Sequence, residues 1–317
     1  MTVHKLPLKQ KAIIGLEDGS LGISHDVDLP RLEEDMILIK NKAVALNPSD
    51  TKFVGKLGIP GAVAGMDFAG EVVATGSKCQ TATHINIGDR ICGAVLGMDP
   101  LRPRVGAFAD FVGAADIAAM KIPEYISYEQ AATLGSSIST IGLALFKSLQ
   151  VPGTPKNPAK KPVDVLVYGG SSSTGALAIQ LLKLRSLKFT LDCISEPETM
   201  RFCYQCLGRT GGKYTALEPY PEFLHDRPRT VVPDWVLGPT VWGKEIGWPA
   251  PFAREANEEN RNFGIEWFQT VQWLLDEGKL KTHPIQLGSG GLDGALEGLE
   301  FLRKKQISGR KLIYSLS

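Results

Sequence analysis

A glycine- and serine-rich loop is the stretch of the sequence with the clearest chemical potential. It reads GGSSSTG over Gly169–Gly175 and follows the apolar run Val163–Tyr168. Glycine lets a backbone turn tightly and approach a ligand, and the N–H groups of a helix that begins here favour an anion such as a pyrophosphate. The spacing is G-G-x-x-x-x-G and not G-x-G-x-x-G, so an ordinary strand–helix turn capped by serine is the alternative.

Cysteine and histidine spacing gives no comparable signal. The five cysteines are odd in number and scattered, which indicates free thiols. Cys203 and Cys206 form one C-x-x-C without the second pair that a structural zinc needs, and the five histidines stand singly. We therefore predict no metal site.

Composition excludes several classes of function. A net charge of +1 over 317 residues gives no general attraction to nucleic acid or to an anionic membrane surface. No apolar run is long enough to span a bilayer, and the first residues, MTVHKLPLKQKAIIG, lack the apolar core of a signal peptide. We expect a cytoplasmic protein with no nucleic-acid or membrane partner.

The elements that position the loop fall into two kinds. From about residue 11 to residue 111, short apolar runs punctuated by Gly, Asp and Pro predict a β-rich lobe. Helical spacing follows, and Ser127 stands three residues before Gln130 as a capping box. After the Pro- and Lys-rich connector 151–162, strand-like and helix-like runs alternate, which indicates a parallel sheet. The sequence thus predicts an α/β protein of two lobes, with a last segment that returns to the first lobe.

Seven motifs carry a resemblance to a known family. They are ALNPSDTKF (45–53), GMDFAGEVVATG (65–76), IGDRICG (87–93), GAFADF (106–111), VYGGSSSTGALAIQLLKL (167–184), LGPTVWG (237–243) and SGRKLIY (308–314). On these motifs the chain resembles the medium-chain dehydrogenase/reductase superfamily. It is most similar to the trans-acting enoyl reductases of fungal polyketide pathways.

The resemblance implies a fold and an activity. A GroES-like lobe would span 11–148, a Rossmann lobe with a doubly wound parallel sheet would span 163–280, and 281–317 would return to the GroES-like lobe. NADPH would lie in the cleft between the lobes. Its hydride would reduce the C=C bond of an α,β-unsaturated thioester carried by the acyl carrier protein domain of a polyketide synthase, in secondary-metabolite biosynthesis. The reductase itself would be a monomer.

One departure from the superfamily bears on the reaction. The zinc-dependent members carry Gly-His-Glu where this chain has Gly65-Met66-Asp67. Alcohol oxidation needs that Lewis acid, whereas the enolate of a thioester can be held by hydrogen-bond donors. The departure favours C=C reduction, with a zinc-free oxidoreductase similar to quinone reductases as an alternative.

The resemblance also implies which residues form the site. Expected cofactor contacts are Pro48, Ser49, Asp50, Thr51, Gly170, Ser172, Ser173, Thr174, Gly175, Leu217, Glu218, Ile307 and Ser308. Expected substrate contacts are Ser137, Ile138, Ser139, Thr140, Ile141, Gly142, Leu143 and Ala144, with Gly238, Pro239, Thr240, Val241 and Trp242 as the far wall. Lys52, Ser139 and Thr140 are the candidate catalytic donors, with a surface lysine and a buried helix face as the alternatives.

Part of the Rossmann lobe is absent from the sequence. A dinucleotide-binding sheet continues from strand 1 and its helix to strands 2 and 3 before strand 4. Here the helix runs directly into KFTLDCIS (188–195), which by resemblance is strand 4. We expect that a native segment is missing and that Leu187 and Lys188 are not bonded; a genuine deletion is the alternative. With a genuine deletion, the protein would bind NADPH very weakly. It would then be either a non-redox cyclase that acts on a polyketide or a non-catalytic partner of the synthase.

Overall fold

The apolar runs of the N-terminal third form strands, as predicted, and these strands pair in antiparallel fashion. A computed structural model describes residues 6–55, 57–79, 85–160, 164–182, 187–207, 211–219 and 230–316. Two strands pair by themselves, β1 (Lys9–Gly15) and β2 (Leu21–Asp28). The larger sheet has the order β12-β13-β3-β4-β5-β7, with β6 also pairing with β3. Its strands are β3 (Met36–Ala45), β4 (Asp67–Thr75), β5 (Arg90–Ala94), β6 (Phe111–Ala115), β7 (Ala119–Lys121), β12 (Ile285–Gly288) and β13 (Lys311–Ser315).

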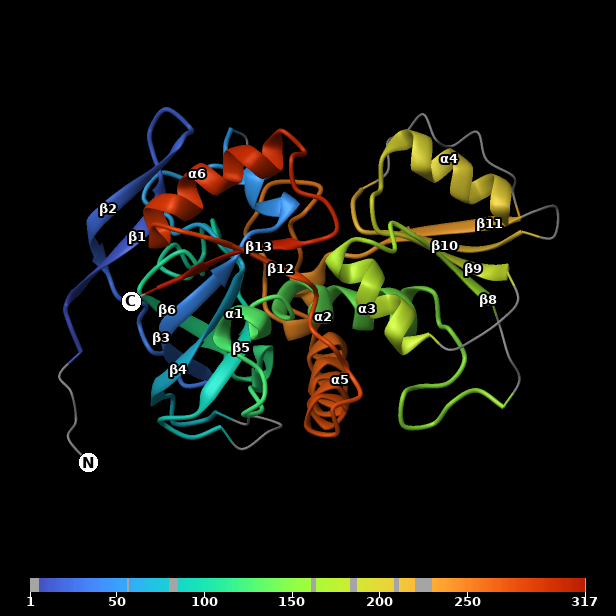
Figure 1. Ribbon diagram of the computed structural model, residues 1–317, viewed down its shortest axis with the longest axis horizontal. Helices are drawn as coiled ribbons and strands as arrows, with labels where there is room; N and C mark the ends of the chain where they lie inside the picture. The colour runs from blue at the N-terminus through green and yellow to red at the C-terminus, as the bar shows by residue number, and fades with distance from the viewer. Residues whose placement is uncertain are drawn as a thin grey trace.

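The C-terminal segment pairs with the start of the chain. In β13, Ile313 lies opposite Ala45 of β3, and β12 runs parallel to β13. Between them α6 (Gly291–Arg303) lies across the upper side of the first lobe in Figure 1. The last segment is therefore part of the first sheet, while the expected boundary at residue 281 stays a prediction.

Apart from α6, the helical elements that pack against the first lobe or join it to the second are mostly short. They are η1 (Pro48–Phe53), η2 (Asp116–Ala118), α1 (Tyr128–Ala131), α2 (Gly135–Gly142), the π-helical turn η3 (Leu143–Ser148), η5 (Gly238–Trp242) and the long α5 (Glu258–Asp276). The predicted capping box is confirmed, because the Ser127 hydroxyl accepts the Gln130 N–H at 3.2 Å and the Gln130 side chain accepts the Ser127 N–H at 3.0 Å. Helix α2 packs against α3 and α5 and so joins the two lobes.

The second lobe contains a parallel sheet, as predicted (Figure 1). Its strands are β8 (Asp164–Tyr168), β9 (Leu187–Asp192), β10 (Gly212–Ala216) and β11 (Val231–Trp235), in the order β11-β10-β9-β8. The helices are α3 (Ser173–Leu181), between β8 and β9, and α4 (Pro197–Cys206), between β9 and β10. Since three strands follow β8 across the sheet in chain order, β9, β10 and β11, the order matches strands 1, 4, 5 and 6 of a Rossmann sheet.

The expected break between Leu187 and Lys188 is wrong. The two residues follow one another inside the uninterrupted strand β9. Leu187 lies opposite Asp164 and Phe189 lies opposite Val165, so the pairing skips Lys188 and the strand is irregular at the junction. The chain is continuous there, and its sheet is short of two strands because the sequence does not contain them.

Candidate functional site

The candidate site is a cavity of about 230 Å³ between the two lobes. From the second lobe it is lined by residues that follow the carboxyl ends of three parallel strands, where open α/β sheets bind their ligands. These are Cys193 and Ile194 after β9, Leu217 and Glu218 after β10, and Val236, Leu237, Gly238 and Pro239 after β11. The start of α3, the start of α2 and the turn η1 also line it, together with Leu57, Met66, Trp248 and Phe252.

Twelve of the expected site residues line this cavity together. They are Pro48, Ser49, Lys52, Ser137, Thr140, Ser172, Ser173, Thr174, Leu217, Glu218, Gly238 and Pro239. Five segments that are far apart in the sequence thus meet at one place. Their roles in binding or catalysis stay predictions.

Several expected contacts on α2 and η3 do not line this cavity, and their contact with a substrate stays a prediction. On a helix, residues three positions apart lie on the same face. Residues two positions apart point in directions that differ by about 200°. Ser137 and Thr140 therefore share the cleft face, while the Ser139 hydroxyl is buried and donates to the Gly135 carbonyl at 3.0 Å. The other side chains turned away from the cavity are those of Ile138, Ile141, Leu143 and Ala144, and Gly142 packs against Trp267.

Other expected contacts also lie outside the cavity. Trp242 is buried against a separate void with Met36 and Val105, so it does not form the far wall. Asp50 is fully buried beneath η1 rather than facing a cofactor. The remaining residues that do not line the cavity are Thr51, Gly170, Gly175, Thr240, Val241, Ile307 and Ser308.

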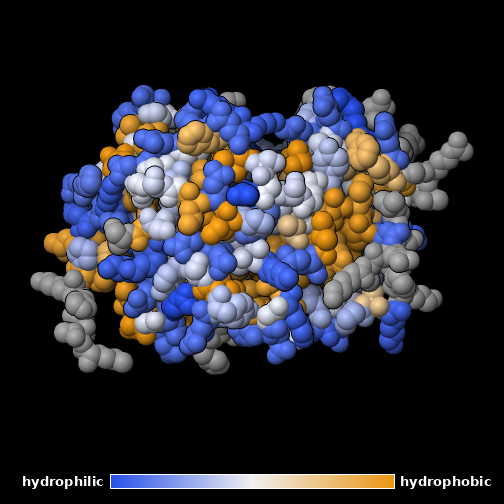
Figure 2. All heavy atoms as spheres, viewed as in Figure 1, coloured by the Kyte–Doolittle hydropathy of each residue, from blue (hydrophilic) through white to orange (hydrophobic). Residues whose placement is uncertain are grey.

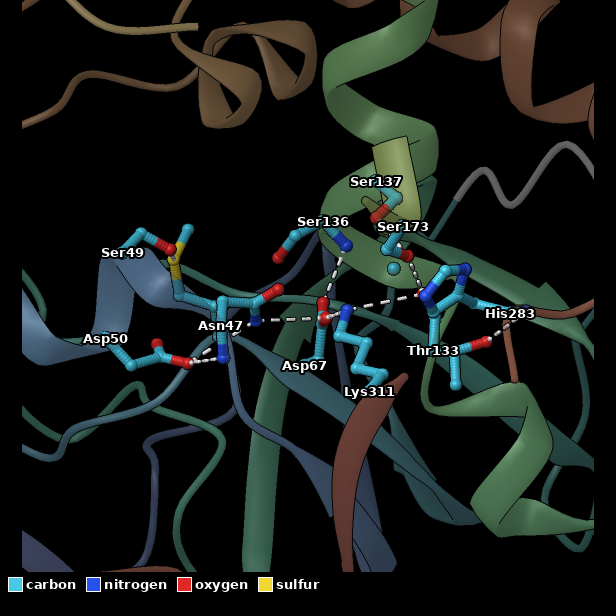
Figure 3. Close-up of polar contacts among 12 residues, drawn as sticks. Asn47, Ser49, Asp50, Asp67, Thr133, Ser136, Ser137, Ser173, His283 and Lys311 are labelled. Atoms are coloured by element: carbon cyan, nitrogen blue, oxygen red, sulfur yellow. Dashed lines mark hydrogen bonds and ion pairs between the residues drawn. The ribbon is translucent and has the colours of Figure 1, made fainter. Parts of the chain in front are cut away.

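A buried polar network holds the floor of the site, as Figure 3 shows. Its centre is Asp67, on β4, which forms an ion pair with Lys311 of β13. The same carboxylate accepts the Ser136 N–H at 2.6 Å and the Asn47 amide at 3.1 Å. The network therefore ties the C-terminal strand, the start of α2 and the residue that precedes η1 to one point.

Asp50 extends this network under the turn that lines the cleft. One of its carboxylate oxygens accepts the Asn47 N–H at 2.7 Å, and among the described residues the other oxygen has no hydrogen-bond partner. Burial raises the pKa of Asp50 to about 8, and the neighbouring Asp67 carboxylate adds to that rise. Asp50 is thus a positioning residue for η1, and burial holds the pKa of its carboxyl well above the usual range.

Two contacts cross from one lobe to the other at the cavity. Lys52 of η1 forms an ion pair with Glu218, which follows β10. The Ser137 hydroxyl, on α2, donates to the hydroxyl of Ser173, at the start of α3, at 2.8 Å. Because exposed ion pairs contribute little, the part-buried serine contact is the better determinant of how the helices meet.

Two nearby groups are poor candidates for acid–base or nucleophilic chemistry. Burial raises the pKa of the Cys193 thiol to about 12, so the thiolate is scarce at neutral pH. Burial and the nearby Lys311 ammonium lower the pKa of His283, which keeps its imidazole neutral. Within the described ranges no three His, Cys, Asp or Glu side chains gather as metal ligands. The prediction of a metal-free site stays a prediction.

The sequence reasoning missed part of the lining. Asn47, Met66 and Ser136 adjoin motif residues, so their proximity to the expected site was the available signal. Trp248 and Phe252 also line the cavity, and their rings meet edge to face at 6.0 Å. The spacing of these two residues in the sequence carried no signal. Their loop is held by a long-range contact, in which the Trp248 side-chain N–H donates to the Met98 carbonyl at 3.0 Å.

Comparison with known proteins decides the family. Residues 33–124 match the alcohol dehydrogenase GroES-like domain. A trans-enoyl reductase from Gibberella zeae is 55% identical, with 98% of each chain covered, and one from a Fusarium species is 43% identical over 97% of this chain and 99% of its own. This chain belongs to the trans-enoyl reductases. They are members of the medium-chain dehydrogenase/reductase superfamily from fungal pathways, so the resemblance drawn from the motifs is confirmed.

Two further findings place this trans-enoyl reductase in its family. The solved CurK enoyl reductase has the same fold, with a TM-score of 0.71 and 14% identity over 97% of this chain and 99% of its own. The match to the Gibberella zeae protein extends over 353 positions, although this chain has 317 residues. At least 36 of those positions, 353 minus 317, therefore have no residue in this chain.

The site fits one end of a nicotinamide dinucleotide. Ser172, Ser173 and Thr174 bring the N-terminus of α3 to the cavity wall, where a helix favours phosphate groups. A Cβ on Gly170 would meet only the flexible end of Ile179, so the loop backbone is open to a ligand. For the adenosine end, the strand that follows α3 in a dinucleotide-binding sheet is not in the sequence. The residues present suit a nicotinamide–phosphate half and do not suit an adenosine half.

Among the described residues, no helix is both long and apolar enough to cross a membrane. The cytoplasmic location and the monomeric state stay predictions.

Proposed function

We propose that this trans-enoyl reductase reduces the C=C bond of α,β-unsaturated polyketide thioesters bound to the acyl carrier protein domain of a polyketide synthase. The observation that supports this most is the cavity between the lobes, where η1, α2 and α3 converge at the carboxyl ends of the parallel strands. A bound NADPH would supply a hydride for the β-carbon. The α-carbon then takes a proton from water.

The Thr140 hydroxyl is the donor that we assign to the thioester carbonyl. It lines the cavity, and among the described residues no hydrogen bond engages it, whereas the Ser139 hydroxyl is bonded to Gly135. As negative charge develops on the carbonyl oxygen, a fixed donor in a partly buried site stabilises the transition state. Lys52 stands across the cavity with Glu218 and adds a positive charge that the enolate can use.

The cavity also contains apolar surface for the alkyl chain. Met66, Leu57 and the ring pair of Trp248 and Phe252 line it beside the polar groups. A site with a few hydroxyls among apolar side chains fits a substrate that has one thioester on a hydrocarbon chain.

The experiment is reduction of an enoyl thioester of N-acetylcysteamine, followed by reduced-nicotinamide absorbance and by product mass. Thr140→Val should lower kcat about 100-fold, the usual effect of removing one oxyanion donor. Thr270→Val is the matched control, because that hydroxyl donates to Glu266 on the surface of α5 and should leave kcat unchanged. Failure of the wild-type protein to reduce the substrate with any reduced nicotinamide nucleotide would refute the proposal.

A non-redox cyclase is the second candidate, and the missing adenosine half is the observation that favours it. The same assay separates the two functions. A cyclised product of unchanged mass, formed without oxidation of the nucleotide, would establish the cyclase.

A further inference from the structure

The second lobe has a sheet edge without a partner in the part of the chain that the structure describes. There β8 pairs only with β9, and the order β8-β9-β10-β11 matches strands 1, 4, 5 and 6 of a dinucleotide-binding sheet. Strands 2 and 3 would lie on the other side of β8. Only residues 183–186 separate Leu182 from β9, and a strand alone averages five to six residues.

The connection through α3 is inconsistent with its place in the sheet. Side chains of a strand alternate between the two faces. In β8, Leu166 and Tyr168 pack with the cluster that contains Met200 and Cys203 of α4. Val165 and Val167 pack with the main core, which contains Leu177 and Ala178 of α3. Helices α3 and α4 therefore lie on opposite faces of the sheet.

Helices on opposite faces make one of the two crossovers left-handed. The steps from β8 to β9 and from β9 to β10 run in the same direction across a parallel sheet. Right-handed connections, found in about 98% of cases, would place both helices on the same face. A helix that connects strand 1 to strand 2, on the other side of β8, belongs on the face where α3 lies. The fold of α3 is thus that of a helix whose next strand is missing.

A groove next to α3 is consistent with missing chain. A cavity of about 460 Å³ lies between Leu181 and Leu182 at the end of α3, the connector around Pro155, and Trp273 of α5. Ile179 of α3 is 52% exposed. Figure 2 shows hydrophobic side chains gathered on this side of the molecule, over α3. Such a surface is normally covered, and at least 36 positions of the match to the Gibberella zeae relative have no residue in this chain.

No residue of β9 replaces the missing adenosine contacts. In a dinucleotide site, an acid at the end of strand 2 binds the ribose, or an arginine nearby accepts the 2′-phosphate. The acid at the end of β9 is Asp192, which is fully buried. Its carboxylate accepts hydrogen bonds from Ile194 N–H (3.0 Å), Ser195 N–H (2.9 Å), the Thr199 hydroxyl (2.6 Å) and the Tyr214 hydroxyl (3.1 Å). That carboxylate is committed to the fold and cannot bind a ribose.

We propose that this chain binds reduced nicotinamide nucleotides through the nicotinamide, its ribose and the adjoining phosphate alone. It therefore does not distinguish NADPH from NADH. This inference rests on the proposed function, since it concerns the nucleotide of the same cavity. The 2′-phosphate that separates the two dinucleotides sits on the adenosine ribose, where this chain has no strand. Reduced nicotinamide mononucleotide, which lacks the adenosine altogether, becomes a third equivalent ligand.

The test is a comparison of dissociation constants for NADPH, NADH and reduced nicotinamide mononucleotide, measured without substrate. Trp248 lines the cavity, so quenching of its emission by the reduced nicotinamide reports binding directly. We expect the NADPH and NADH constants to agree within about threefold and the mononucleotide to bind within tenfold of both. A preference for NADPH over NADH of 30-fold or more, or no binding of any of the three, would overturn the inference. If nucleotides bind alike but no enoyl thioester is reduced, the proposed function fails and this inference does not.

A chimera provides the second arm. The segment that joins the first helix of the nucleotide-binding sheet to its fourth strand is taken from the Gibberella zeae relative and inserted between Leu182 and Leu187. An insertion of equal length made of Gly and Ser is the matched control. The relative's segment should restore a preference for NADPH over NADH of at least tenfold, while the Gly–Ser insertion should not. A folded chimera that binds both dinucleotides alike would contradict the assignment of the adenosine half to this segment.

Discussion

Removal of the Lys311 ammonium should expose how strongly the floor of the site depends on one buried charge pair. The side chains of Lys311 and Asp67 are 4% and 0% exposed. Lys311→Met keeps most of the packing volume but leaves the Asp67 carboxylate with two hydrogen bonds, from the Ser136 N–H and the Asn47 amide. The carboxylate would then be a buried charge without a counter-ion.

The magnitude follows from the burial of the pair. Breaking a buried ion pair by removing one partner costs about 3–5 kcal/mol, and unit charges about 4 Å apart interact by about 4 kcal/mol at an effective dielectric constant of 20. Domains are stable by about 5–15 kcal/mol, so the single variant should lose a large share of its stability. Asp67→Asn with Lys311→Met leaves neither charge and should recover at least half of that loss.

The measurement is urea unfolding of both single variants and the double variant, followed by tryptophan fluorescence. Lys78→Met is the control, because Lys78 and its partner Glu34 are 70% and 64% exposed and should contribute little. The reasoning is refuted if Lys311→Met costs less than about 1 kcal/mol, or if the losses of the two single variants simply add in the double variant.

Three further perturbations test other parts of the molecule. Because burial raises the pKa of Asp50 to about 8, above its unfolded value, this group should make the free energy of unfolding fall between about pH 4 and pH 8. Asp50→Asn cannot ionise, so its free energy of unfolding should fall less over this pH range than that of the wild type. Parallel curves of the two free energies against pH, measured by urea unfolding, would contradict the expected role of Asp50. Gly170→Val should raise the NADPH dissociation constant at least tenfold with little loss of melting temperature, since its Cβ meets only the Ile179 side chain; unchanged affinity would exclude the loop from the site. Amide hydrogen exchange by mass spectrometry should be faster in β8, paired on one side, than in β10, paired on both; equal protection would show that another segment covers the β8 edge.

The first lobe could be predicted from the sequence because its signals are local. Apolar runs between Gly, Asp and Pro marked the strands, and the Ser127–Gln130 spacing marked the start of α1. The motifs also located four of the segments that line the cavity. They did not determine which way each side chain points: within α2 the prediction took every residue from Ser137 to Ala144, although the helical period separates Ser139 from Thr140.

Trp242 shows a second reason why the residues that line a site are not predicted from the sequence. Its motif is recognisable, but the direction of the ring is set by the rotation of the short turn η5, which no residue type specifies. The ring that reaches the cavity is that of Trp248, placed by a hydrogen bond to a carbonyl some 150 positions earlier. Long-range contacts of this kind leave no periodic trace in the sequence.

The two lobes differ in whether the local sequence pattern agrees with the way the strands are connected. In the first lobe, local pattern, strand pairing and buried core all lead to the same sheet. In the second lobe each piece forms as its local sequence predicts: β8 is a strand, α3 a helix capped by Ser172, and β9 a strand. Only their connection violates the handedness rule, and this chain has at least 36 fewer residues than the positions that its match to the Gibberella zeae relative spans. The loss of an internal segment produces this combination of correct local structure and an improbable topology. A deletion leaves the flanking sequence patterns intact but removes the strands with which the flanking elements would pair.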